Sequence, residues 1–321
     1  MKKHLWAGML LAPVLLLSAC SGKADTGGQA AGEQATNLRF AVVTHGSAGD
    51  AFWDVVKNGA EAAGKEHGVK VTYQGDGDPQ KQSQLIEAAI SEKVDGLVVS
   101  MANPDALKAS VEKAVKAGIP VVTINSGQEK SAEFGALTHV GQSEVIAGRG
   151  AGGKLKEAGI KHLVCVIHEA GNIGLEQRCQ GAKEALGGQV ENLQVDINDV
   201  ANASATIKAK LQADKSVDGV LTLNPAVGVA ARDAVRDSGS SAKVATFDLS
   251  GDVIDAVKNG EILFAVDQQQ YLQGYLPIVF LKLYKTNLNT VGGGQPVLTG
   301  PGFVTKENAD QVAKLAEAGT R

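Results

Sequence analysis

The sequence predicts an α/β protein with two similar lobes, each built on a doubly wound parallel sheet, and three observations support this fold class. Apolar runs of strand length alternate with helical patterns from residue 38 onward. One unit of strand, helix and strand occurs twice, about 120 residues apart. The roughly 280 residues in this region are enough for two domains rather than one.

The expected strands are mostly continuous runs of valine, isoleucine and leucine, a pattern typical of parallel strands covered on both faces. They lie at 38–44, 69–73, 96–101, 120–125, 162–168, 193–197, 219–224, 243–248 and 263–266. Between them, apolar stripes such as Leu85 to Ile90 and Leu107 to Val115 predict amphipathic helices. Asp78 and Pro79 indicate a helix start, so we do not interpret the acidic stretch around them as a metal site.

The repeated unit places polar residues at matching strand ends. In the first copy a strand at 94–99 leads through a helix to a strand that ends at Asn125. In the second copy a strand at 217–222 leads through a helix to a strand that ends at Asp248. Open α/β sheets bind ligands beyond the carboxyl ends of their strands. We therefore expect Asn125 and Asp248 to face a shared crevice from opposite lobes.

The N-terminus predicts export. Lys2 and Lys3 precede an apolar stretch at 5–17, and small residues then lead to Cys20. This pattern is typical of a lipoprotein signal peptide at 1–19, with lipidation at Cys20 and a flexible tether at 20–37. The protein is then anchored at the cell envelope, on the outer face of the cytoplasmic membrane or in the periplasm. The alternative is a secreted protein without a lipid.

Charge and cysteine content narrow the function classes. The net charge is −4 and no basic cluster occurs, which argues against a nucleic-acid partner. Beyond Cys20 the chain has two cysteines, Cys165 and Cys179. An even number of cysteines in an exported chain favours a disulfide, and two buried free thiols are the alternative.

Enzyme signatures are missing from the sequence. The turn after the first strand reads HGSAGDAFW, which lacks the glycine spacing of a nicotinamide-binding loop. No G-x-S-x-G elbow is present. His168 and Glu169 have no second histidine at zinc-ligand spacing. We predict a binding protein without enzymatic activity, cofactor or metal.

The order of these pieces over some 240 residues resembles the type I periplasmic binding proteins of the ribose and galactose kind. The segments that carry the resemblance are HGSAGDAFW at 45–53, AGIPVV at 117–122 before Asn125, Gly171 and Asn172, Arg178 and Gly181, Asn224, Phe247 and Asp248, and Gln268 with Gly274. The resemblance implies a three-segment hinge, with chain crossings near 139–141, 266–268 and 297–302. It places 38–139 with 268–297 in the N-terminal lobe, and 140–267 with 298–321 in the C-terminal lobe.

The same resemblance implies a monomer that closes over a small sugar or polyol and delivers it to the permease of an ABC importer. A receptor role, for a signalling molecule or for a membrane sensor of sugar, is the alternative. The implied ligand contacts are His45, Asp50, Phe52, Trp53, Asn125, Ser126, Arg178, Asn224, Asp248 and Gln268. Asn125 stands where relatives often carry aspartate, and Ser126 stands where ribose binders carry arginine. These two differences argue against ribose itself as the ligand.

For two of these residues, a role in the fold is the alternative to a role in ligand binding. His45 could serve the fold rather than the ligand, and Arg178 could be a surface arginine on a helix. We expect replacement of Asp248 or Arg178 by alanine to abolish ligand binding and to leave the melting temperature of the unliganded protein nearly unchanged. A disulfide between Cys165 and Cys179 would hold the helix that bears Arg178.

Overall fold

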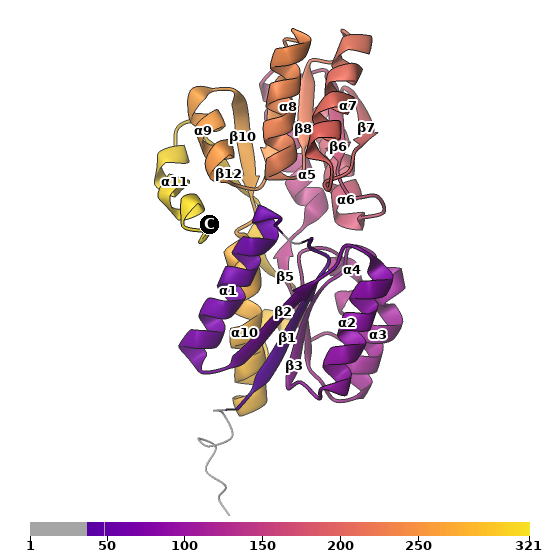
Figure 1. Cartoon of the computed structure of the whole chain (residues 1–321), viewed down its shortest axis with the longest axis vertical. Helices are drawn as coiled ribbons and strands as arrows, with labels where there is room; N and C mark the ends of the chain where they lie inside the picture. Colours follow the sequence, from indigo (N-terminus) through magenta and orange to yellow (C-terminus); the bar gives the residue numbers. More distant parts are fainter. Residues whose placement is uncertain (1–36, 48) are drawn as a thin grey trace, which may run out of the picture.

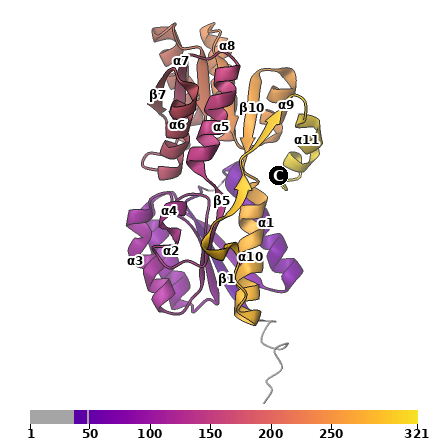
Figure 2. The ribbon, with the colours of Figure 1, turned by 180° about the vertical axis from the view of Figure 1, so that it is seen from behind.

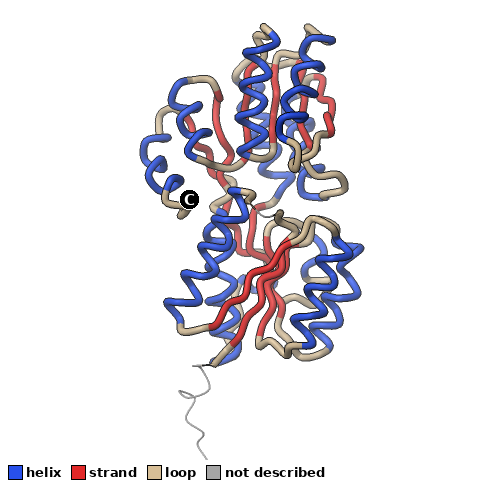
Figure 3. The backbone as a smooth tube through the Cα atoms, viewed as in Figure 1, coloured by secondary structure: helices blue, strands red, loops and turns tan. Residues whose placement is uncertain are grey.

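A computed structural model describes residues 37–47 and 49–321 as two α/β lobes, one above the other in Figure 1 and Figure 3. The predicted signal peptide, the lipidated Cys20 and nearly all of the tether lie outside the described residues. Each lobe has a six-stranded sheet between two layers of helices. The predicted fold class is therefore confirmed.

The N-terminal lobe holds the sheet β11-β5-β4-β3-β1-β2, in which every neighbouring pair is parallel. Its strands are β1 (Arg39–Thr44), β2 (Lys70–Gly75), β3 (Gly96–Ser100), β4 (Val121–Ile124), β5 (Thr138–Gln142) and β11 (Val297–Gly300). Its helices are α1 (Ala51–His67), α2 (Pro79–Ser91), α3 (Pro104–Lys116), α4 (Gln128–Ser131) and α10 (Gln270–Asn287). Helices α1 and α10 share one apolar core on one face of the sheet, and α2 and α3 share another on the opposite face.

The C-terminal lobe holds the sheet β12-β10-β9-β8-β6-β7, in which only the β10–β12 pair is antiparallel among the described strands. Its strands are β6 (His162–Ile167), β7 (Gln189–Gln194), β8 (Gly219–Thr222), β9 (Lys243–Phe247), β10 (Ile262–Asp267) and β12 (Gly302–Thr305). Its helices are α5 (Glu144–Glu157), α6 (Ile173–Leu186), α7 (Val200–Ala213), α8 (Pro225–Ser238), α9 (Gly251–Asn259) and α11 (Ala309–Glu317).

The predicted strands agree with the structure except at one edge. The prediction at 193–197 is displaced, because β7 is Gln189–Gln194 and its sequence QVENLQ is mostly polar. Three strands were not predicted, namely β5, β11 and β12. Each of the three lies next to a place where the chain passes from one lobe to the other, as the view in Figure 2 shows.

The chain passes between the lobes three times. It leaves β5 of the N-terminal lobe for α5 at Ser143, and it returns from β10 to α10 through Gln268 and Gln269. The third crossing joins β11 to β12 at Pro301. Gln269 has φ of 54°, a left-handed conformation that turns the chain sharply at the second crossing.

The two lobes touch across the cleft, so the structure represents a closed arrangement. The backbone N–H of Ile173 in the C-terminal lobe donates to the carbonyl oxygen of Ala102 in the N-terminal lobe, at 3.0 Å. Gly174 packs so closely on Ser126 that a Cβ at Gly174 would lie 2.7 Å from Ser126 Oγ. A side chain at position 174 would therefore obstruct closure.

Candidate functional site

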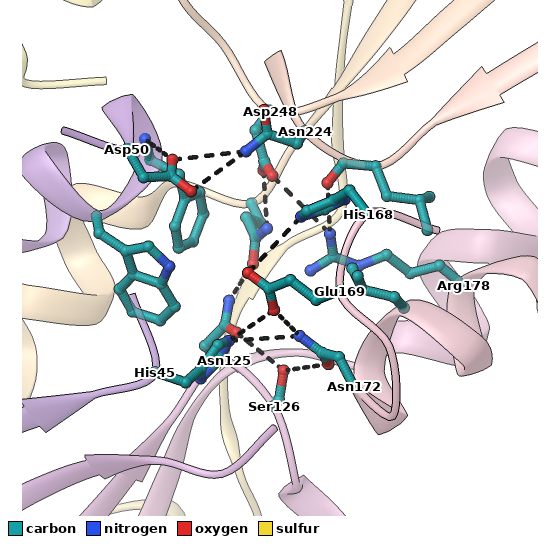
Figure 4. Close-up of a pocket in the computed structure, with 15 residues that line it drawn as sticks. His45, Asp50, Asn125, Ser126, His168, Glu169, Asn172, Arg178, Asn224 and Asp248 are labelled. Atoms are coloured by element: carbon teal, nitrogen blue, oxygen red, sulfur yellow. Dashed lines mark hydrogen bonds and ion pairs between the residues drawn. The ribbon is translucent and has the colours of Figure 1, made fainter. Parts of the chain in front are cut away.

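One cavity between the lobes brings all ten predicted ligand-contact residues together (Figure 4). Its free volume in this closed arrangement is about 30 Å³, less than a sugar ring occupies, so the side chains that line it must move apart to admit one. Five further residues line it that the sequence did not predict as contacts. They are His168, Glu169, Asn172, Leu175 and Leu223.

Asn125 and Asp248 lie at matching strand ends, as the repeat predicted. Asn125 follows β4 with φ of 61°, and Asp248 follows β9 with φ of 69°. Asparagine and aspartate tolerate this left-handed conformation better than other non-glycine residues. Both side chains are buried and line the cavity.

Gln268 links these two residues through the hinge. Its Nε2 donates to Asp248 Oδ1 at 2.7 Å, and its Oε1 accepts from Asn125 Nδ2 at 3.2 Å. Gln273 Nε2 donates to the same Oε1 at 2.9 Å and fixes the orientation of the Gln268 amide. The second crossing therefore carries a polar bridge between the central contact residues of the two lobes.

Arg178 is buried, so the alternative of a surface arginine is wrong. Its Nε donates to Glu144 Oε2 at 2.6 Å and its Nη2 donates to Glu144 Oε1 at 3.0 Å, in a two-point ion pair. Nη1 lies 3.8 Å from Asp248 Oδ2, and the guanidinium lies over the Phe247 ring with 4.8 Å to its centre. Both partners of the ion pair have side chains under 5% exposed. Arg178 therefore serves the fold as well as the cavity.

Close packing of α5 on α6 places Glu144 beside Arg178. Gly148 of α5 contacts the backbone of Arg178, and Gly181 of α6 contacts the backbone of Val145, both too closely for a side chain. A disulfide between Cys165 of β6 and Cys179 of α6 fastens the same helix to the sheet, as the cysteine count predicted.

Asp50 and Asn224 face each other from opposite lobes, and both also cap helices. Asp50 Oδ1 accepts from Phe52 N at the start of α1, and Asn224 Oδ1 accepts from Ala226 N at the start of α8. Asn224 Nδ2 lies 3.4 Å from Asp50 Oδ2, which is a long contact. Their helix caps hold both side chains at the rim of the cavity.

The aromatic residues form one wall in the N-terminal lobe. Trp53 contacts His45 with ring centres 4.7 Å apart and Phe52 with ring centres 4.9 Å apart, both edge to face. His45 Nδ1 is hydrogen-bonded to Ser100 Oγ at 2.7 Å, so the ring also has a structural contact. His45 lines the cavity all the same.

The unpredicted residues come from the loop between β6 and α6, from α6 itself, which carries Leu175, and from the end of β8. Asn172 caps α6 by accepting from Gly174 N at 3.0 Å, and its Oδ1 also accepts from Ser126 Oγ across the cleft at 3.4 Å. Glu169 Oε2 accepts from Asn172 Nδ2 at 2.6 Å. His168 and Glu169 carried no periodic signal, because they lie in a loop whose position depends on both lobes.

Burial shifts the pKa values of four side chains that line the cavity. It raises the pKa of Asp248 to about 7, and Arg178 opposes the shift only in part. It raises the pKa of Asp50 to about 6. It lowers the pKa of His45 to about 3 and that of His168 to about 4, so both rings are neutral near pH 7. The cavity therefore offers hydrogen-bonding groups with little positive charge beyond Arg178.

One potential metal-ligand cluster lies elsewhere among the described residues. His162, Glu191 and Asp214 have ligand atoms within 4.8 Å of one another. Lys210 Nζ lies 2.7 Å from Glu191 Oε1 and 3.5 Å from Asp214 Oδ2, so an ammonium already pairs with the carboxylates.

Within residues 37–47 and 49–321 no helix is both long and apolar enough to cross a membrane.

Comparison with known proteins agrees with this architecture. Residues 40–287 match the periplasmic binding protein domain family. A crystal structure of a carbohydrate transporter from Acidothermus cellulolyticus 11B, in complex with myo-inositol, is 44% identical with a TM-score of 0.87, and the match covers 89% of this chain and 100% of that chain.

Two curated relatives are more distant. The D-ribose/D-allose-binding protein of Pseudomonas aeruginosa is 28% identical over 281 residues, which are 83% of this chain and 87% of the relative. The xylose/arabinose-binding protein of Sulfolobus acidocaldarius is 24% identical over 246 residues, which are 70% of this chain but only 60% of the relative. Since the family match extends over most of the two-lobed region, the chain belongs to the periplasmic binding protein family.

Proposed function

We propose that this protein captures a small sugar or cyclic polyol between its lobes and delivers it to an ABC importer. The observation that carries the proposal is the convergence of polar side chains from both lobes and the hinge on one cavity. Binding proteins of this family are not enzymes, and ligand capture requires no covalent step.

The chemistry of the cavity suits a compact polyhydroxylated ligand. Each ligand hydroxyl both donates and accepts, and an unpaired buried polar group costs about 1–3 kcal/mol. Asp50 and Asp248 supply acceptors, while Asn125 and Arg178 supply donors. Trp53 supplies an apolar surface for a ring face. The myo-inositol complex of a protein 44% identical to this chain supports a cyclic polyol as the first candidate.

Hinge closure is the proposed mechanism. With the crossings at Ser143, at Gln268 and Gln269, and at Pro301, the N-terminal lobe comprises 38–142 and 270–300, and the C-terminal lobe comprises 144–267 and 302–321. A ligand that contacts both lobes binds the closed arrangement better than the open one and shifts the population toward it. A permease can then distinguish loaded from empty protein by the relative position of the lobes.

Membrane attachment completes the proposal. A signal peptide at 1–19 would direct export, and lipid on Cys20 would anchor a monomer at the cell envelope through the tether at 20–37. The names of the curated relatives, which include import binding proteins for ribose and apiose, support an extracytoplasmic role beside a permease.

The test is thermal unfolding of the tether-free protein in the presence of inositols, pentoses, hexoses and linear polyols. A ligand that binds only the folded state raises the melting temperature by mass action. The Asp248→Ala variant should lose the shift, and the Asp255→Ala variant, altered at an exposed position of α9, should keep it. Absence of any shift across the panel, or an undiminished shift in Asp248→Ala, would overturn the proposal.

A further inference from the structure

Two cavities meet at one wall in the cleft between the lobes. The inner cavity, described above, has a free volume of about 30 Å³. An outer cavity of about 570 Å³ adjoins it. Four residues line both cavities and therefore form the wall, namely His45, His168, Glu169 and Asn172.

Glu169 is the most adjustable part of this wall. The other three residues are buried, each at 6% exposure or less, whereas the Glu169 side chain is 22% exposed. His45 is fixed by its hydrogen bond to Ser100, and Asn172 is fixed by capping α6. The Glu169 side chain extends from the C-terminal lobe, and its carboxylate points across the cleft toward the N-terminal lobe (Figure 4).

The contacts of the carboxylate span the whole width of the wall. Oε2 accepts from Asn172 Nδ2 at 2.6 Å and lies 3.8 Å from His45 Nε2, while Oε1 lies 3.9 Å from His168 Nε2. One strong hydrogen bond thus holds the side chain on its own lobe, and the remaining contacts are long. The carboxylate closes the wall without being locked to the opposite lobe.

We propose that Glu169 sets the size of ligand that the protein accepts. Its side chain limits how far the inner cavity can widen toward the outer cavity when a ligand enters, so a bare ring is accepted and a ring with a substituent on that side is excluded. This inference rests on the proposed function, since it concerns how the same site selects among sugars and polyols. Steric exclusion of this kind discriminates by raising the cost of the wrong ligand.

The outer cavity is suited to receive a second polyhydroxylated unit once Glu169 is shortened. Its lining includes Asn103, Gln194, Asp196 and Asn202, which offer amide and carboxylate groups from both lobes. Gln194 Nε2 donates to the backbone carbonyls of Ile167 and Val195, both at 3.0 Å, which fixes the orientation of this side-chain amide. A glycosyl group in this space would keep its hydroxyls hydrogen-bonded.

The experiment measures affinity by calorimetry for myo-inositol, D-ribose and D-xylose, each beside its mono-glucoside. Five proteins are compared: the unaltered sequence, Glu169→Ala, Glu169→Ser, Glu169→Gln and Glu176→Ala. Glutamine retains the size of glutamate without its charge. Glu176 is an exposed glutamate on the neighbouring helix α6 and serves as the matched control. Glu169→Ser provides a second shortened side chain.

We expect the unaltered protein to prefer a bare ring over its glucoside by roughly 100-fold, within the range that steric discrimination reaches. Glu169→Ala and Glu169→Ser should reduce this preference to about tenfold or less by binding the glucoside more tightly. Glu169→Gln and Glu176→Ala should retain the preference of the unaltered protein.

Three results would overturn the inference while leaving the proposed function intact. These are equal affinity of the unaltered protein for ring and glucoside, an unchanged preference in both shortened variants, and a loss of preference in Glu169→Gln as large as that in Glu169→Ala. Failure of the unaltered protein to bind any of the three rings or their glucosides would instead count against the proposed function, and the inference would fall with it.

Discussion

Replacing Arg178 with methionine should destabilise the unliganded protein strongly, although Arg178 lines a ligand cavity. The change removes the two hydrogen bonds of 2.6 and 3.0 Å to Glu144 and leaves that carboxylate buried, at 3% exposure. Removing one partner of a buried ion pair costs about 3–5 kcal/mol. At about 2–4 °C per kcal/mol, the melting temperature should fall by roughly 10 °C.

A double-mutant cycle separates the ion pair from other effects of the substitution. The variants are Arg178→Met, Glu144→Met and the double variant, unfolded by urea without ligand. Replacement of both partners by apolar side chains removes the stranded charge, so the double variant should regain most of the lost stability. A loss below about 1 kcal/mol in Arg178→Met, or a double variant no more stable than either single one, would refute the reasoning.

Three further predictions concern closure, pH and the disulfide. Gly174→Ala should weaken ligand affinity by about tenfold, because its Cβ would lie 2.7 Å from Ser126 Oγ, and titration calorimetry checks this. Because burial raises the pKa of Asp248 to about 7, the unfolded state binds fewer protons there, and the contribution of Asp248 to the stability of the unliganded protein should fall as pH rises from about 4 to 7. The lowered pKa values of the buried His45 and His168 act in the opposite direction, so Asp248→Asn should make stability rise more steeply with pH in urea unfolding. Replacing Cys165 and Cys179 with alanine should lower the free energy of unfolding by about 2–4 kcal/mol and weaken ligand binding, as unfolding and calorimetry would show.

Each of these predictions has a control or a contrary outcome. Gly153→Ala in α5 adds a Cβ that meets nothing within 4 Å, so it should leave ligand affinity unchanged. An affinity unchanged in Gly174→Ala would mean that closure tolerates the contact. An unchanged pH profile in Asp248→Asn would show that the Asp248 carboxyl does not have a raised pKa. Equal affinity before and after loss of the disulfide would show that the bond does not hold Arg178 in place for binding.

The sequence predicted most of the strands and missed the three that lie next to the hinge, for a physical reason. Internal parallel strands such as β3 and β8 are buried on both faces, so they read as continuous apolar runs. Strand β5 reads THVGQ, because it ends where the chain leaves the lobe and its neighbours include polar hinge residues. Edge strand β7 is half exposed and mostly polar. The apolar residues at its end and just beyond it led to the displaced prediction at 193–197.

Part of the site was accessible from the sequence because strand ends and helix starts have local signals. Asn125 and Asp248 were found through the repeat, and Asn224 precedes a proline at a helix start. The Glu144–Arg178 pair joins residues 34 apart, and it depends on how closely glycines allow α5 and α6 to approach. No local pattern encodes that distance. Glu169 likewise has no local signal, because the wall that it completes includes His45 of the other lobe.

The lengths of the contacts show what a ligand contributes to closure. Within the C-terminal lobe and hinge, the polar contacts are short, such as 2.6 Å between Arg178 and Glu144 and 2.7 Å between Gln268 and Asp248. Between the lobes, the side-chain contact of Asn224 with Asp50 is 3.4–3.5 Å long, beyond the usual range of 2.7–3.2 Å. Hydrogen bonds of this length stabilise the closed state weakly. A ligand whose hydroxyls bond to both lobes would supply shorter bridges across the same gap, and its differential affinity for the closed state would then set the population of closed protein.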